Sequence, residues 1–272
     1  MLPKLLCVFA VVGTVYLGLK SDFIFTSANA SFRMLEMRSP AQIGQVHVDD
    51  RSDLFVPLTD SVEYAVPAEV IYNTKSSVTD GRRWHHYKPE SGAKPVATLL
   101  LFHGAGRDGL SMIDMWRVVA NKHNLQLVAL DGRKKNWPQE SVEPAILHRI
   151  LDEVGEPLSS DREPVYLFGH SNGGAYVQRL LNEAEGPWRA AAIHAGFADP
   201  ARGIIPAEPK PVRYYIGTRE HIFTPNSART VATGLAERGH NVDLQIIPQH
   251  THWFYVAGPV IAADAWDWFS RQ

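Results

Sequence analysis

Six predominantly apolar runs of strand length, all between residues 96 and 247, constrain the fold of this chain more than any other sequence feature. Such runs are typical of β-strands that are covered on both faces, as in parallel sheets. Segments with helical composition or helical spacing of apolar residues separate them, which implies crossover connections. The pattern predicts an α/β fold, with a mainly parallel sheet and helices on both faces. The runs span residues 96–102, 125–130, 165–168, 190–194, 212–216 and 242–247.

The stretch that precedes these runs is organised differently. Residues 31–62 are polar and weakly patterned, and we expect a spacer there. Residues 64–72 and 82–87 have the composition of strands, and turn-prone residues at 76–81 separate them. The sequence therefore predicts one folded domain over residues 63–272.

The N-terminus has the pattern of a targeting segment. Lys4 precedes an uncharged, mostly apolar run over residues 5–19, which is shorter than the about 20 residues of a membrane span but fits the h-region of a signal peptide. Ala28-Asn29-Ala30 offers a cleavage site, so we expect residues 1–30 to be a signal peptide or, if uncleaved, a membrane anchor. The protein would then be periplasmic, secreted or attached to a membrane. A buried helix of a cytosolic protein is the remaining alternative.

The charge balance identifies no class of charged partner. The chain has 27 basic and 29 acidic side chains and a formal net charge of −2, whereas a general nucleic-acid binder carries a basic surplus. Its single cysteine, Cys7, cannot form an intramolecular disulfide. We therefore expect no nucleic-acid partner and a fold that depends on packing rather than on crosslinks.

A G-x-S-x-G motif, Gly169-His170-Ser171-Asn172-Gly173, directly follows one apolar run and precedes a helical pattern. In this strand–turn–helix context the sharp turn strains the serine and raises its hydroxyl above the sheet, while the small flanking residues let strand and helix approach each other. The motif alone also occurs by chance as a glycine-rich turn, but the flanking elements favour a nucleophile elbow. Ser171 is therefore the candidate nucleophile.

A serine nucleophile needs a base that takes its proton and an acid that orients the base. On an elbow of this kind the chain order is serine, carboxylate, histidine. Glu220 and His252 follow two later apolar runs in that order. We favour His252 over His250 because the aromatic residues behind it should fix its ring, and we expect His221 at the surface or in a supporting position. The two histidines could also suggest zinc, but no third ligand of suitable spacing accompanies them, so we expect no metal.

Attack of a serine on a carbonyl group places negative charge on the carbonyl oxygen, which then needs N–H donors. One expected donor is the backbone N–H of Asn172, directly after the nucleophile, and the other comes from the loop after an early strand. Ala105, in a glycine-rich loop behind the first apolar run, is the expected second donor. His103, His170 and Trp253 are the expected substrate contacts.

Together these features resemble the α/β-hydrolases and, within them, the group of polyhydroxybutyrate depolymerases and feruloyl esterases. The resemblance covers roughly residues 64–269. It rests on Leu-Phe-His-Gly at 101–104, Ala-Leu-Asp-Gly at 129–132 with Trp137 beyond, the segment 164–175 around the motif, and His-x-His-Trp at 250–253.

The resemblance implies a serine hydrolase that cleaves carboxylic esters through an acyl-enzyme intermediate, without metal or organic cofactor. Ser171, Glu220 and His252 would form its catalytic triad. The chain departs from the group in two places. The group more often uses Asp where this chain has Glu220, and its elbow commonly reads G-x-S-A-G, whereas Asn172 occupies that position here. These departures weaken the assignment to one subfamily.

The connection between the fourth and fifth apolar runs bears on the substrate. Many α/β-hydrolases insert a lid domain there, whereas here only about 16 residues lie between the strand expected to end near Ala195 and the one expected to start near Val212. We therefore expect no large lid and an open groove. Trp137 and Trp253 are candidates to line this groove, with ordinary packing beside a catalytic loop as the equal alternative. An open groove favours large or polymeric ester substrates, such as polyesters or plant-type aromatic esters.

Two other functions fit parts of the pattern. A serine peptidase on the same fold would usually carry a large N-terminal propeller, but only about 60 residues precede the expected domain. An exported binding protein without catalysis would typically have lost one member of the triad, and all three are present. Ester hydrolysis is therefore the expected function.

Overall fold

The computed structural model of the protein describes residues 43–272, apart from 59–62, 156–162, 204–205 and 207. The expected leader at 1–30 and the first part of the expected spacer lie outside the described residues. None of the helices in the described part of the chain combines the length and the apolar character that a membrane span requires.

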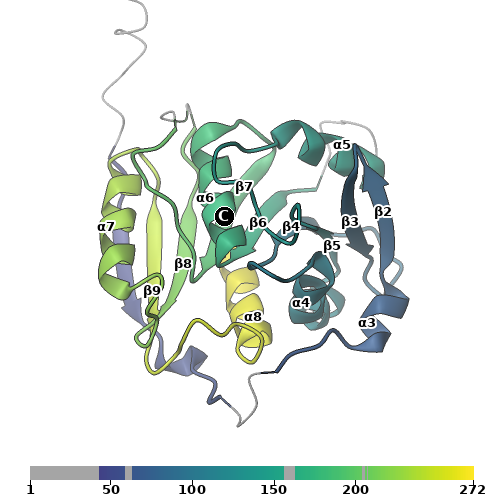
Figure 1. Ribbon diagram of the computed structural model, residues 1–272, viewed down its shortest axis with the longest axis horizontal. Helices are drawn as coiled ribbons and strands as arrows, with labels where there is room; N and C mark the ends of the chain where they lie inside the picture. The colour runs from purple at the N-terminus through teal and green to yellow at the C-terminus, as the bar shows by residue number, and fades with distance from the viewer. Residues whose placement is uncertain (1–42, 59–62, 156–162, 204–205, 207) are drawn as a thin grey trace, which may run out of the picture. The chain divides into compact units, whose positions relative to one another are not determined.

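A nine-stranded sheet forms the centre of the described domain, in the order β1-β9-β8-β7-β6-β4-β5-β3-β2. Adjacent strands are parallel from β1 through β5 in this order, and antiparallel where β3 joins β5 and β2 joins β3. Figure 1 shows this order from β9 to β2, left to right. The six predicted runs are β4 to β9, which confirms the mainly parallel sheet. The strands are β1 (Val46–Asp50), β2 (Lys75–Thr79), β3 (Arg82–Tyr87), β4 (Ala97–Phe102), β5 (Leu125–Leu130), β6 (Val165–His170), β7 (Trp188–His194), β8 (Val212–Gly217) and β9 (Val242–Ile247).

Helices cover both faces of the sheet, as predicted. Leu99 and Leu101 of β4 pack in one core cluster with residues of α4 and α8, while Leu100 and Phe102 pack in a second cluster with residues of α5, α6 and α7. Because successive side chains of a strand point to opposite faces, one apolar run fills both clusters. The helices are α3 (Ala68–Asn73), α4 (Gly109–His123), α5 (Pro144–Val154), α6 (Asn172–Glu183), α7 (Pro225–Ala236) and α8 (Gly258–Phe269).

The strand order changes direction beside β4, and this positions the functional loops. The chain passes from β4 through α4 to β5 on one side, and then through α5 to β6 on the other side of β4. The loops that follow β4 and β6 therefore diverge. In open parallel sheets this is the place where ligands bind.

Two predictions upstream of β3 are wrong. The segment at 64–72, predicted as a strand, contains most of α3, in which Val70 alone is buried. The predicted turn at 76–81 is mostly strand β2, and the turn itself is confined to Asp80 and Gly81, both at positive φ. An edge strand that meets solvent needs few apolar residues, so β2 lacks the pattern of a buried strand.

The segment predicted as a spacer also contributes to the sheet. β1 pairs in parallel with β9, and the 3-10 turn η1 (Ser52–Leu54) follows it. Val46 and Val48 are 39% and 37% exposed, and they are the only apolar residues of this strand, so β1 lacks the continuous apolar run of a covered strand. Pairing with β9 stabilises this segment, and that partner lies about 200 residues away in the chain. The folded domain thus begins before residue 63.

The connection between β7 and β8 is short, as predicted. Its described residues, within 195–211, contain neither helix nor strand. No large lid domain is therefore inserted at this position.

Candidate active site

Ser171 lies at the turn between β6 and α6, with φ 53° and ψ −122°. Positive φ in a non-glycine residue is strained and persists only where the surrounding structure imposes it. The flanking glycines permit the turn: a Cβ on Gly169 would lie 2.5 Å from the carbonyl oxygen of Gly173, and a Cβ on Gly173 would lie 2.3 Å from that of Phe102. The turn therefore has the strained geometry that the motif predicts.

Ser171, His252 and Glu220 lie in one hydrogen-bonded line although they come from three separate loops. Nε2 of His252 is 2.9 Å from Oγ of Ser171, and Nδ1 is 2.7 Å from Oε2 of Glu220. With its proton on Nδ1, the ring donates to the carboxylate, and Nε2 can then accept the proton of the serine hydroxyl. The structure thus brings together the three residues singled out as a triad.

Glu220 is held as an anion. Its side chain is 0% exposed, and Oε1 accepts hydrogen bonds from the backbone N–H groups of Ile222 at 2.7 Å and Phe223 at 3.2 Å. Burial alone would raise the pKa of Glu220, but the hydrogen bonds from His252 and from these N–H groups outweigh it, and the pKa is lowered overall. An ionised carboxylate can stabilise positive charge on His252.

His250 belongs to a separate chain of buried histidines. Its Nε2 is 2.8 Å from Nε2 of His194, and Nδ1 of His194 is 2.9 Å from Nδ1 of His170. Three neutral rings satisfy both hydrogen bonds, because the middle ring can donate through one nitrogen and accept through the other. Burial lowers the pKa of all three, that of His250 to about 4. His170, an expected substrate contact, is therefore an interior residue, with its ring centroid 5.3 Å from that of His252.

The loop that follows β4 lies against the elbow. A Cβ on Gly104 would lie 3.3 Å from Cβ of Ser171, so the next residue, Ala105, is close to the nucleophile. Among the described residues, no hydrogen-bond acceptor occupies the backbone N–H of Ala105 or of Asn172. Asn172 begins α6, and the first N–H groups of a helix have no partner within it. Both N–H groups therefore remain candidate donors to an oxyanion.

Comparison with known proteins bears on the fold. No family model and no curated protein matches the chain. An esterase from the Planctomycetes species Thermogutta terrifontis aligns with a TM-score of 0.57 and 15% identity, over 73% of this chain and 94% of its own. A carboxylesterase from Mesorhizobium loti aligns with a TM-score of 0.58 and 21% identity, over 74% of this chain and 100% of its own. A poly(3-hydroxybutyrate) depolymerase from Bordetella parapertussis aligns with a TM-score of 0.52 and 19% identity, over 74% of this chain and 90% of its own.

The chain has the α/β-hydrolase fold. At such low identities the likeness establishes the fold alone and leaves activity to be argued from the site. Within the α/β-hydrolase fold, the described line of side chains has the expected placement. Ser171 follows β6, Glu220 follows β8 and His252 follows β9.

Two residues expected at the substrate groove instead support the loop after β4. His103 is fully buried; its Nε2 accepts from the N–H of Gly132 at 2.8 Å, and its Nδ1 donates to the carbonyl oxygen of Gly104 at 2.7 Å. Trp137 is also buried. Its indole N–H donates to the carbonyl oxygen of His103 at 2.8 Å, and its backbone N–H donates to Oδ1 of Asn172 at 2.7 Å. Both expectations are corrected, because these side chains hold the loop against the elbow.

Aromatic side chains beside the triad were missed in the sequence. The ring of Phe223 stacks on that of His252 with centroids 6.0 Å apart, and Phe197 meets Phe223 edge-on at 4.9 Å. Trp253, an expected substrate contact, is half-buried and lies 5.4 Å beneath the guanidinium carbon of Arg107. Neither Phe197 nor Phe223 belongs to a recognisable motif, so only the tertiary structure reveals them.

A second line of hydroxyl, imidazole and carboxylate lies at the β2 edge of the sheet. Oγ of Ser76 is 2.8 Å from Nδ1 of His85, and Nε2 of His85 is 3.1 Å from Oδ1 of Asp131. Ser76 is exposed on a regular strand, directly across from His85 in the antiparallel pair. The described part of the chain therefore contains two hydrogen-bonded lines of hydroxyl, imidazole and carboxylate.

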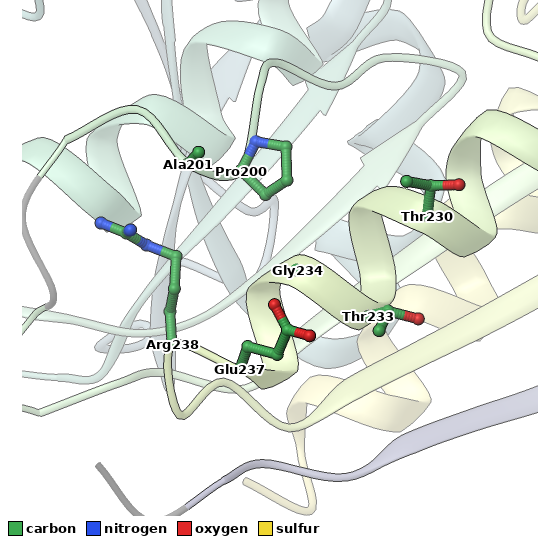
Figure 2. Close-up of a pocket in the computed structure, with 7 residues that line it drawn as sticks. All are labelled: Pro200, Ala201, Thr230, Thr233, Gly234, Glu237 and Arg238. Atoms are coloured by element: carbon green, nitrogen blue, oxygen red, sulfur yellow. The ribbon is translucent and has the colours of Figure 1, made fainter. Parts of the chain in front are cut away.

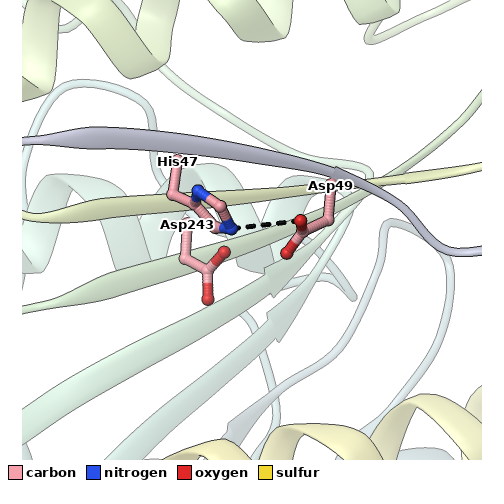
Figure 3. A group of neighbouring side chains, drawn as sticks. All are labelled: His47, Asp49 and Asp243. Atoms are coloured by element: carbon pink, nitrogen blue, oxygen red, sulfur yellow. Dashed lines mark ion pairs between the residues drawn. The ribbon is translucent and has the colours of Figure 1, made fainter.

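One described group of side chains has the spacing of metal ligands: His47, Asp49 and Asp243, whose ligand atoms lie within 4.8 Å of one another (Figure 3). His47 is 3.0 Å from Asp49. The carboxylate of Asp243 accepts from Arg213 at 2.9 Å and from Gln245 at 2.6 Å. A cation would compete with these partners, and the group instead ties β1 to β9 and β8.

An open hollow of about 560 Å³ lies between the loop after β7 and the C-terminal part of α7 (Figure 2). The hydroxyl groups of Thr230 and Thr233 point away from Pro200, and no member of the triad lines the hollow. Its lining brings together no nucleophile and base, so we assign it no role in chemistry. The lining residues are Pro200, Ala201, Thr230, Thr233, Gly234, Glu237 and Arg238.

Proposed function

We propose that the protein is a serine hydrolase that cleaves carboxylic esters, with Ser171 as nucleophile, His252 as general base and Glu220 as orienting acid. One observation carries the proposal. The two ring nitrogens of His252 contact the serine oxygen at 2.9 Å and the carboxylate at 2.7 Å. This is the arrangement by which a neutral hydroxyl becomes a nucleophile at neutral pH.

The reaction would proceed in two halves. Ser171 attacks the ester carbonyl carbon while its proton moves to Nε2 of His252, and the backbone N–H groups of Ala105 and Asn172 stabilise the oxyanion. His252 then donates the proton to the departing alcohol, which leaves an acyl group on Ser171. In the second half a water molecule, deprotonated by His252, attacks this acyl group and releases the acid. The lowered pKa of Glu220 keeps a negative charge beside the imidazolium throughout.

We further propose that the enzyme acts on large esters, such as polyesters or plant-type aromatic esters. The connection between β7 and β8 supports this, because its described residues form no lid element. Phe197, Phe223 and Trp253 offer aromatic surface near the triad. A lid-free site with aromatic walls suits a chain or ring that extends past the scissile bond.

Labelling with a fluorophosphonate probe and an ester panel test the proposal together. The panel spans acyl length, aromatic acyl groups and polymer films, with aminoacyl amides as the peptidase comparison. We expect Ser171-dependent labelling and turnover of esters but not of amides. A folded protein in which Ser171 stays unlabelled would instead support a binding protein, and preferred cleavage of amides would support a peptidase.

A further inference from the structure

We propose that Arg107, Lys134 and Lys135 form an anion-binding rim beside the nucleophile, which selects esters that carry a second, ionised carboxylate. This inference rests on the proposed esterase function and names a substrate class for it. The rim consists of two loop segments that meet at the elbow.

Arg107 is held at the site by aromatic rings rather than by an acid. Its guanidinium carbon lies 5.5 Å, 5.4 Å and 4.9 Å from the ring centroids of Tyr64, Trp253 and Tyr255, and one N–H group donates to the backbone carbonyl oxygen of Tyr64 at 3.1 Å. No carboxylate of the described residues lies within 4.0 Å of its guanidinium nitrogens. Cation–π contacts fix such a planar group while leaving N–H donors available to a ligand.

The position of Arg107 follows from its neighbours along the chain. Its backbone N–H donates to the carbonyl oxygen of Gly104 at 3.2 Å, so it closes the turn that contains Ala105. Trp253, one of its ring partners, directly follows His252. The guanidinium therefore lies between the loop of the candidate oxyanion donor and the loop of the catalytic histidine.

Lys134 and Lys135 come from the loop after β5, which packs on the same turn. The N–H of Gly106 donates to the carbonyl oxygen of Lys135 at 2.9 Å. Both lysines are exposed and lie at positive φ, 49° and 59°. Two consecutive non-glycine residues in this conformation are strained, and such strain is concentrated at functional sites. In the described structure neither ammonium group has an ion-pair partner.

Acidic residues near the rim are already engaged. Asp108 caps α4 by accepting from the N–H of Ser111 at 3.1 Å. Asp131 accepts from His85 and from the N–H of Gly109. Neither carboxylate forms an ion pair with Arg107, Lys134 or Lys135 within 4.0 Å in the described structure, so the hydrogen-bond donors of the rim are not taken up by these acids.

The two sides of the nucleophile differ in character. Phe197 and Phe223 follow β7 and β8, on one side of β6 in the sheet, while the rim follows β4 and β5 on the other side. An ester with an apolar part at one end and a carboxylate at the other would match both sides at once. Arginine is suited to this carboxylate because its fork of N–H groups can bind both oxygens.

Two substrate pairs test the rim, one for each side of the ester bond. The first pair is 4-nitrophenyl hydrogen adipate and 4-nitrophenyl hexanoate, and the second is 4-butyryloxybenzoate and its methyl ester. In each pair only one member carries a carboxylate. The measured quantity is the ratio of kcat/KM for the charged ester to that for the neutral ester. We expect Arg107→Gln to lower this ratio about three- to tenfold in at least one pair, since the site is partly solvated.

Further variants keep the test independent of folding. Lys134→Gln with Lys135→Gln should lower the ratio less than Arg107→Gln, and Arg107→Lys should restore part of it. Arg229→Gln, an exposed cation on α7, is the matched control and should leave it unchanged. Raising the salt concentration should also lower the ratio in the unmodified protein.

The outcomes separate the two proposals. If the protein neither hydrolyses any neutral ester nor reacts with fluorophosphonate at Ser171, the esterase function itself is wrong. If neutral esters are hydrolysed but the ratio is insensitive to Arg107, to both lysines and to salt, the esterase function stands and the anion-binding rim is wrong. If Arg107→Gln does not fold, the lysine variant and the salt dependence decide.

Discussion

The two lines of hydroxyl, imidazole and carboxylate are closely similar in their distances. In the first, the contacts of His252 measure 2.9 Å and 2.7 Å, and in the second those of His85 measure 2.8 Å and 3.1 Å. Their surroundings differ. Ser171 is strained at a turn before a helix, whereas Ser76 lies in a regular edge strand.

The two lines also differ in the orientation of the imidazole and in the N–H donors near the serine. His252 faces the carboxylate with Nδ1 and the serine with Nε2, while His85 is turned the other way. Beside Ser171, the start of α6 offers a free N–H group, and no helix begins at Ser76. Three groups in line therefore do not suffice. Catalysis also needs a raised hydroxyl and donors for the charge that develops on the substrate.

Removing the two hydroxyl groups gives the largest contrast. We expect Ser171→Ala to lower kcat for an aryl ester by at least about 10⁴-fold, because no acyl-enzyme can form. Ser76→Ala, the matched control, should stay within about twofold of the unmodified protein. Initial rates with circular dichroism as a folding check measure both, and comparable losses in the two variants would contradict the assignment.

Replacing each of the two histidines by alanine tests which imidazole is the base. His252→Ala should lose nearly as much kcat as Ser171→Ala, since members of a triad act as a unit. His250→Ala should lose far less, because His250 contacts His194 rather than the serine. Kinetics of the two variants at neutral pH measure this, and an equal loss at His250 would overturn the choice of His252.

Neutralising the carboxylates gives an intermediate effect. Glu220→Gln should lower kcat by roughly 10² to 10⁴-fold, because Gln keeps the shape but cannot stabilise the imidazolium. Asp131→Asn should instead lower the free energy of unfolding by about 1 to 2 kcal/mol, since it disturbs hydrogen bonds from His85 and Gly109. Rates and urea unfolding, recorded for both variants, separate a catalytic carboxylate from a structural one.

The smallest effect concerns stability and pH at the histidine chain beneath the triad. Burial lowers the pKa of His250 to about 4, whereas an unfolded histidine titrates near 6.5. Between these values the unfolded chain binds more protons, so stability falls as the pH falls. We expect His250 to account for a loss of about 2 kcal/mol between pH 7.5 and pH 5. Urea unfolding at both pH values should show a smaller difference in His250→Gln, and an unchanged difference would refute the expectation.

Much of the fold could be predicted because the signals are local. Most residues of each of the strands β4 to β9 are apolar and buried, so the sequence alone marks these segments as covered strands. β1 and β2 were not predicted because their pairing partners, and not their own side chains, stabilise them as strands. Helix α3 was mistaken for a strand because six residues are too few to show a helical period.

The candidate site divides in the same way. Ser171, Glu220 and His252 could be singled out from a motif and from chain order. Phe223 and Arg107 could not, because no spacing links either residue to Ser171. For Trp137 the sequence left groove lining and ordinary packing open, and the structure decides for packing, because its indole N–H donates to the backbone carbonyl oxygen of His103.

By itself, the sequence determined the alternation of covered strands and helices and the strained turn that presents Ser171. Both depend on residues within a few positions of one another, where period, glycine placement and turn chemistry act directly. Only the tertiary structure decided that His252, and not His250, reaches a serine 81 positions away, and that the ring of Phe223 stacks on that histidine. Side chains so far apart in the chain meet only after the sheet has assembled, because its packing and strand order set where each loop ends.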